Sequence, residues 1–129
     1  MASTGSLHDG FVPGRHLIDA YGNGGFRFAE MSHRGSILML PSGVRAWAPD
    51  DALAIDRNAL RPVVAEGAAV ELLLIGTGLD IAPLPDALRC WLKEAGIGLD
   101  VMQTGAAART YNILVAENRK VAAALVAVA

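Results

Sequence analysis

The segment VELLLIGTG, residues Val70 to Gly78, decides the fold class of this chain. Its first six residues are almost continuously apolar, and the run stops at a Gly-Thr-Gly turn. An apolar run of this length, bounded by turn residues, is typical of a β-strand that is covered on both faces, as in a parallel sheet. We therefore expect Val70–Ile75 to be a central strand of an α/β domain.

A helix is predicted directly after this strand, from Leu84 onward. Apolar residues recur there at the spacing of one helix face, at Ala87, Leu88, Trp91, Leu92 and Ala95. Pro85 suits the first turn of a helix, and Gly96 is placed to end it. The pattern predicts the first of two main helices.

The residues that follow alternate between strand and helix. Leu99–Met102 is predicted to be a short strand. Thr104 is then predicted to cap the second main helix, whose apolar side carries Ala107, Ala108, Tyr111, Leu114 and Val115. Three valines favour a buried strand over Val121–Val128. Because the links between the last three strands are long enough to be crossovers, we expect these strands to pair in parallel.

Two pairs of short strands are predicted upstream. His16–Tyr21 and Phe26–Phe28 flank a Gly-Asn-Gly-Gly turn, whose residues adopt positive φ at low cost, so an N-terminal β-hairpin is expected. Ser36–Leu40 and Val44–Ala48 are separated by Pro-Ser-Gly and form the second predicted pair.

The stretch from Asp50 to Arg61 lacks sustained periodicity, and Pro62 interrupts it, so we expect a connector with at most one helical turn, around Asp56–Leu60. Residues 1–15 hold isolated apolar residues among Gly, Ser and Pro, which predicts a flexible leader. The fold class is therefore α/β, with a single domain over residues 16–129 and a mixed, partly parallel sheet.

Composition excludes several classes of protein. The chain has 129 residues, of which 53% are hydrophobic and 19% charged, so most of it can form one packed core. A net charge of −2 provides no field that would attract nucleic acid. The longest apolar run, Val121–Ala129, is too short to span a bilayer. The single cysteine, Cys90, gives no internal disulfide, and we expect a cytoplasmic location.

No motif predicts catalysis or metal binding. The histidines at 8, 16 and 33 lack the close spacing of metal ligands. The Gly-Thr-Gly turn lacks the third glycine of a dinucleotide fingerprint, because Ile81 stands in that place, and no Gly-Lys-Ser/Thr loop occurs. We therefore expect no metal and no cofactor, and a function without catalysis is favoured over an enzyme.

Two groups of polar residues leave alternatives open. Arg27, Arg34 and Arg45 form either a small cationic surface or an ordinary solvated face, and acidic neighbours favour the solvated face. Arg109 and Asn112, three residues apart on one helix side, either bond a loop such as the Gly-Thr-Gly turn or hold a small ligand. Structural hydrogen bonding is favoured for this pair.

Five motifs together resemble a known family. They are Tyr21–Phe28 (YGNGGFRF), Arg34–Leu38 (RGSIL) with Pro41, Leu74–Gly78 (LIGTG), Thr104 with Ala107–Asn112 (AARTYN), and Glu117–Leu125 (ENRKVAAAL). As a set they resemble the small α/β domain that prokaryotic single-domain proteins of unknown function share with the mitochondrial respiratory complex I assembly factor three. The resemblance covers about Leu17 to Leu125.

The resemblance implies a three-layer fold and a non-catalytic role in binding or assembly. Because the sequence shows no Arg-rich presequence, we expect a bacterial source. The implied partner is another protein, with subunits of a membrane complex among the candidates. The candidate binding surface carried over comprises Gly76, Thr77, Gly78, Thr104, Arg109, Tyr111 and Asn112, with no catalytic role for any of them. Two alternatives remain: a small-molecule binding protein or enzyme that uses the turn at 76–78, and a structural subunit of a homo-oligomer.

Overall fold

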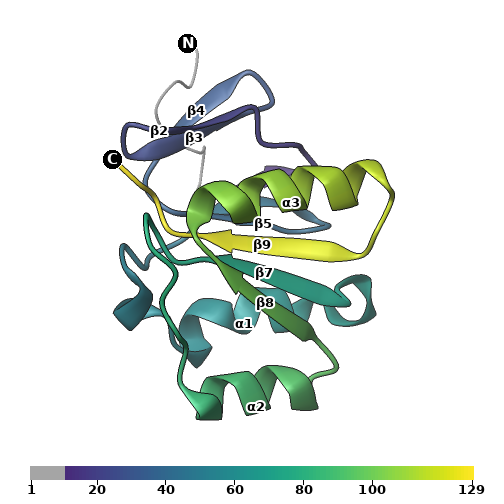
Figure 1. The fold of residues 1–129 in the computed structure, drawn as a ribbon. Helices are drawn as coiled ribbons and strands as arrows, with labels where there is room; N and C mark the ends of the chain where they lie inside the picture. The colour runs from purple at the N-terminus through teal and green to yellow at the C-terminus, as the bar shows by residue number, and fades with distance from the viewer. Residues whose placement is uncertain (1–10) are drawn as a thin grey trace.

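A six-stranded mixed sheet organises residues 11–129, the part of the chain that the computed structural model describes (Figure 1). The strands lie in the order β1 (Phe11–Pro13), β6 (Gly43–Ala46), β5 (Ile37–Met39), β9 (Val121–Leu125), β7 (Leu72–Gly76) and β8 (Gly98–Met102). β7 pairs in parallel with both β8 and β9, whereas β9, β5, β6 and β1 pair antiparallel. The predicted mixed, partly parallel sheet is confirmed.

Three layers result from what covers this sheet. One face carries α3 (Thr104–Ala116) and a three-stranded sheet of β2 (Ala20–Gly22), β3 (Gly25–Phe28) and β4 (Met31–Arg34) (Figure 1). The other face carries α1 (Arg57–Ala65) and α2 (Asp86–Glu94), with two short 3-10 helices, η2 (Ala52–Ala54) and η3 (Gly67–Ala69), in the connections.

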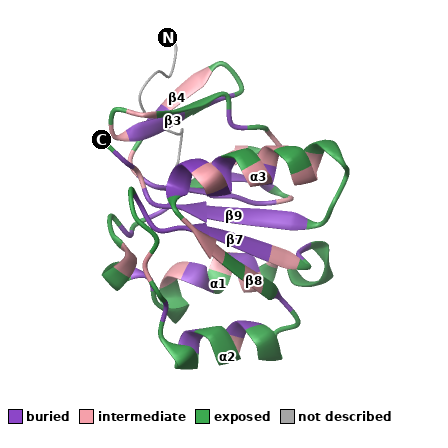
Figure 2. Ribbon diagram, viewed as in Figure 1, coloured by how far each residue is buried: buried purple, intermediate pink, exposed green. Residues whose placement is uncertain are grey.

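The continuous apolar run that predicted β7 is explained by these two coverings. Side chains alternate along a strand, so Leu73 and Ile75 enter the core shared with α1 and α2, whereas Leu74 enters the core shared with α3. All three are fully buried, and β7 and β9 are the buried centre of the molecule (Figure 2). The predicted interior position of β7 is confirmed.

The connector predicted from Asp50 to Arg61 is wrong, because helix α1 occupies Arg57–Ala65 and makes a third main helix. Asp56 caps this helix by accepting a hydrogen bond from the Ala59 N–H at 2.8 Å. Leu60 and Val63 are fully buried, and their burial offsets the one backbone hydrogen bond that Pro62 removes inside the helix.

Two strands that the sequence did not predict extend the N-terminal half. Residues 1–10 of the predicted leader lie outside the described residues, but Phe11–Pro13 form β1 and pair with Gly43–Arg45 of β6. Strand β4 follows β3 through a two-residue turn, Ala29 and Glu30, closed by the pair Phe28 and Met31. Neither turn residue is a usual turn former, which explains why β4 escaped prediction.

The hydroxyl of Thr104 joins three elements at the carboxyl end of the parallel strands. It donates to the Val126 carbonyl at 2.7 Å and accepts from the Gly78 N–H at 3.0 Å, and the residue is fully buried. Gly76 packs against it so closely that a Cβ there would lie 2.8 Å from the Thr104 Cα. The ends of β7 and β9 are thereby fixed to the start of α3.

Thr104 is therefore not the helix cap that the sequence analysis predicted. The cap is Gln103, whose backbone is extended and whose Oε1 accepts from the N–H groups of Gly105 and Ala106 at 2.8 and 3.3 Å. Because Gln103 already satisfies these N–H groups, the Thr104 hydroxyl is available for the two strand ends.

We expect Thr104→Val to lower the free energy of unfolding by about 2 kcal/mol, because it leaves the buried Gly78 N–H and Val126 carbonyl unpaired while keeping the side-chain shape. Urea unfolding monitored by circular dichroism measures this change. Thr104→Ser, which keeps the hydroxyl, is the matched control and should lose clearly less. Equal stability of the valine variant and the parent would contradict the role given to the hydroxyl.

We expect Glu30→Gly to raise the free energy of unfolding by about 1 kcal/mol, because Glu30 adopts a left-handed φ that glycine tolerates better. Its φ is 61°, and that of Ala29 is 49°. The control Glu30→Gln removes the charge without relieving the backbone and should leave stability unchanged. If both variants shift the thermal midpoint equally, the effect belongs to the charge.

Candidate functional site

The seven residues of the predicted binding surface separate into two groups of contacts. Gly76, Thr77, Gly78 and Thr104 meet at the carboxyl end of β7. The Thr77 hydroxyl lies 2.8 Å from the Asp80 carbonyl and 3.2 Å from that of Met102, and it accepts from the Ala82 N–H at 3.0 Å. The polar groups of this turn are thus occupied by the protein itself.

Tyr111 and Asn112 form the second group, on α3, where they bind the segment 16–18. The Asn112 side chain accepts from the Ile18 N–H at 2.8 Å and donates to the Ile18 carbonyl at 2.7 Å. The Tyr111 hydroxyl donates to the His16 carbonyl at 3.2 Å. These side chains bond this segment and not the Gly-Thr-Gly turn.

Arg15 precedes the segment 16–18, bonds the chain near the start of β9 and affects the pKa of Tyr111. Its guanidinium donates to the carbonyls of Arg119 and Val121 at 2.8 and 3.1 Å. Burial raises the pKa of Tyr111 to about 12, and the nearby charge of Arg15 opposes part of that rise. The phenol therefore stays protonated and remains a hydrogen-bond donor.

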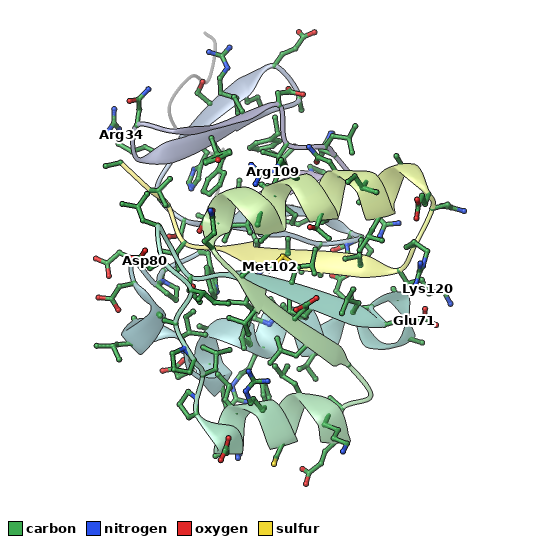
Figure 3. All side chains as sticks on the ribbon, in the orientation of Figure 1. Arg34, Glu71, Asp80, Met102, Arg109 and Lys120 are labelled. Carbon is green, nitrogen blue, oxygen red and sulfur yellow. The ribbon has the colours of Figure 1, made fainter. Side chains whose placement is uncertain are left out.

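Arg109 is the one exposed residue among the seven. It lies on α3, on the same side of the main sheet as Arg34 of the three-stranded sheet (Figure 3). A guanidinium in this position can meet a partner, whereas the other six residues are buried or half-buried.

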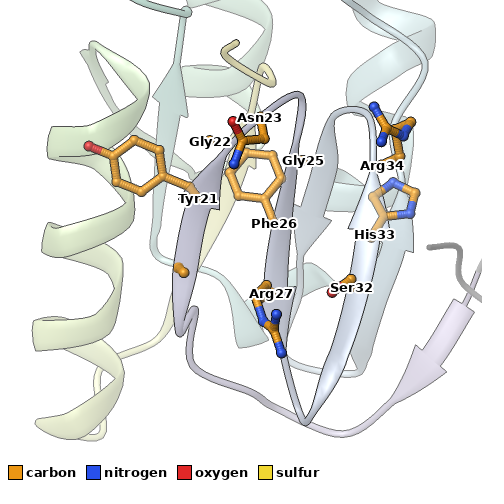
Figure 4. Close-up of a pocket in the computed structure, with 10 residues that line it drawn as sticks. Tyr21, Gly22, Asn23, Gly25, Phe26, Arg27, Ser32, His33 and Arg34 are labelled. Atoms are coloured by element: carbon orange, nitrogen blue, oxygen red, sulfur yellow. The ribbon is translucent and has the colours of Figure 1, made fainter. Parts of the chain in front are cut away.

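A cavity of about 270 Å³ lies on the three-stranded sheet, away from the predicted surface (Figure 4). Its lining residues come from all three strands and the first turn: Ala20, Tyr21, Gly22, Asn23, Gly25, Phe26, Arg27, Ser32, His33 and Arg34. We name it the arginine cavity, after Arg27 and Arg34. The sequence analysis singles out Arg27 and Arg34 but does not predict the cavity, because Ser32, His33 and Arg34 belong to the unpredicted β4.

The strand register explains the hollow. Gly22, Gly25 and Arg34 lie opposite one another across the three strands, and the next row on the same face is Ala20, Arg27 and Ser32. Two glycines and an alanine leave the middle of the face empty, so the two arginines flank a depression. Gly25 is required there, because a Cβ would lie 2.1 Å from the His33 carbonyl.

The opposite face of this small sheet is anchored in the protein. Phe26 is buried in the core beneath α3, and the buried His33 ring lies 3.1 Å from the Ser36 carbonyl through Nε2. Tyr21 points toward α3, where a Cβ on Gly105 would lie 2.2 Å from its hydroxyl (Figure 4). The arginine cavity therefore rests on a fixed support.

Arg27 and Arg34 are exposed, belong to neighbouring strands and line the two ends of the cavity (Figure 4). Planar guanidiniums bind carboxylates and phosphates through paired hydrogen bonds. Arg45, the third arginine of the predicted cationic surface, lies instead on β6, over the Phe11 ring at 5.5 Å from its centroid. Two of the three arginines thus line one cavity, and the third lies elsewhere.

Two further findings concern metals and membranes. Within residues 11–129, no three His, Cys, Asp or Glu side chains gather where they could hold a metal ion. Over the same described range, no helix has the length and apolar character needed to cross a membrane.

Comparison with solved structures agrees with this architecture. A crystal structure described as an outer membrane protein from Bartonella henselae aligns with a TM-score of 0.87 and 51% identity, over 91% of this chain and 98% of that one. A Mth938-like domain from Bordetella pertussis aligns with a TM-score of 0.76 and 31% identity, over 85% of this chain and 84% of that one.

Sequence relatives fall into two groups. An uncharacterised protein of Rhodobacter capsulatus is 44% identical over 84% of this chain and 82% of its own length. NADH dehydrogenase (ubiquinone) 1 alpha subcomplex assembly factor 3 of Xenopus tropicalis is 27% identical over 85% of this chain and 60% of its own length. This chain spans less than two thirds of the length of the assembly factors that it matches.

A family model matches residues 18–126 and confirms the resemblance that the motifs indicate. The match begins at Ile18, which Asn112 bonds, and ends at Val126, whose carbonyl accepts from Thr104. Its description is "Protein of unknown function (DUF498/DUF598)", and this chain belongs to that family.

Proposed function

We propose that this chain is a non-catalytic protein-binding domain of the assembly-factor type, and that it contacts an acidic segment of its partner through the arginine cavity. The distant similarity to complex I assembly factors, over 85% of this chain, supports an assembly role. A subunit of a respiratory membrane complex is the partner we propose, with binding at its cytoplasmic side in a bacterial cell.

The observation that carries the binding surface is the pair of arginines on a rigid, hollow sheet face. Arg27 and Arg34 flank the depression left by Gly22 and Gly25. A sheet that is already fixed against α3 loses little conformational freedom when a partner binds. An acidic segment that lies along the cavity can place a carboxylate against each guanidinium and gain charge-assisted hydrogen bonds there.

Of the seven residues predicted from the sequence, we keep Arg109 in the proposed binding surface, because it is exposed on α3 and adds a positive charge on the same side of the main sheet. The small-molecule alternative at the Gly-Thr-Gly turn is not proposed. The hydroxyls of Thr77 and Thr104 and the Gly78 N–H already make internal hydrogen bonds.

We expect the double variant Arg27→Glu/Arg34→Glu to weaken partner binding at least about tenfold, because two charge-assisted contacts become repulsions. The tagged full chain is used to capture proteins from gently solubilised host membranes, and the amount of each co-purifying respiratory subunit is measured by mass spectrometry. A fluorescent peptide rich in Asp and Glu gives the affinity directly.

Arg45→Glu is the matched control, because this exposed arginine lies outside the cavity and should retain full binding. Arg109→Ala reports separately on α3. Failure of the unaltered chain to bind any protein would contradict the binding function itself. Equal binding by the unaltered chain and the double variant would contradict only the assignment of the surface.

A further inference from the structure

Strand β8 is the outermost strand of the main sheet, and one of its edges has no neighbouring strand among the described residues (Figure 1). The Gly98 N–H donates to the Glu71 carbonyl, and the Met102 carbonyl accepts from the Thr77 N–H. Backbone groups of residues 98, 100 and 102 therefore face β7. In a strand, the backbone N–H and carbonyl groups of successive residues point to opposite sides. The groups of Leu99 and Val101 therefore point away from β7, toward the open edge of the sheet.

A groove of about 390 Å³ runs beside this edge. It is lined by residues of the loop after β7, of α2 and of β8: Ile81, Ala82, Pro83, Arg89, Leu99, Asp100 and Val101. The loop leaves two large apolar side chains in solvent, with Leu79 73% and Ile81 65% exposed. Exposed apolar residues beside free backbone groups are the features of a surface that receives an extended chain.

We infer that β8 accepts an extended segment of a partner protein as an additional strand. The backbone groups of Leu99 and Val101 pair with the segment, and the groove takes its alternate aliphatic side chains. Asp100 is exposed on the strand, so the residue that lies opposite it in the partner is basic.

The charge on β8 argues against a second copy of this chain as the occupant. Two copies paired antiparallel through both Leu99 and Val101 would place Asp100 directly opposite Asp100. Like charges in this position destabilise a strand pair. A partner segment with alternating aliphatic residues and a central Lys or Arg can pair its backbone with the open edge of β8 and place its positive charge opposite the Asp100 carboxylate.

This surface shares no residue with the arginine cavity, because the groove is formed by α2, β8 and the loop after β7. The two surfaces can therefore be tested independently, and failure of the proposed function would leave this inference standing.

The test uses the full chain and two short synthetic peptides of alternating Val and Thr, one with a central Lys and the other with a central Glu. Amide hydrogen exchange is followed by NMR. In the free protein, the Leu99 and Val101 amides should exchange fast, whereas Asp100 and Met102 should be protected by β7. The Lys peptide should slow exchange at Leu99 and Val101 about tenfold or more, and the Glu peptide should do so less.

Two variants separate backbone pairing from charge. Val101→Pro removes an outward N–H, and the Lys peptide should then no longer protect the Leu99 amide from exchange. Asp100→Lys should reverse the preference, so that the Glu peptide protects more than the Lys peptide. Circular dichroism checks that both variants keep the fold. Absence of protection by both peptides would overturn the inference. Protection that rises with protein concentration in the free chain would also overturn it, because the occupant would then be a second copy.

Discussion

The hydroxyl of Thr104 is the interaction on which the arrangement of the main sheet depends. It is buried where β7 and β9 end and α3 begins, and one oxygen bonds both chain segments that leave the sheet there. Gly76 must lack a side chain for the helix to come so close. The position of α3, and hence of the three-stranded sheet that packs with it, follows from this junction.

The elements that could be predicted from the sequence are those whose own pattern of apolar residues shows which of their faces are buried. The run Val70–Ile75 is apolar because both faces of β7 are covered, and α2 has a clear apolar side that ends at Gly96. The elements that escaped prediction depend on contacts distant in sequence. Helix α1 contains Pro62, and its Leu60 and Val63 are buried in the core beside the sheet. Strand β4 follows a turn of Ala29 and Glu30 and pairs with β3.

The candidate site shows the same division. Thr104, Tyr111 and Asn112 belong to the candidate surface that the resemblance implies, yet they hold segments of the fold together. For Asn112, the sequence already favours structural hydrogen bonding over ligand binding. Polarity within a helix does not reveal whether a side chain bonds the protein or a partner. The arginine cavity could not be predicted without β4, because its shape depends on a register that places Gly22, Gly25 and Arg34 in one row and Ala20, Arg27 and Ser32 in the next.

The strand order has a consequence for how the chain is made. β9 joins the antiparallel and parallel halves of the sheet, and it follows all other described strands in the chain. During synthesis, β5 and β7 therefore leave the ribosome before β9, the strand that lies between them. Their edges toward β9 stay unpaired until residue 125 has emerged. Until β9 pairs, the facing edges of β5 and β7 stay open, and open sheet edges are prone to aggregation.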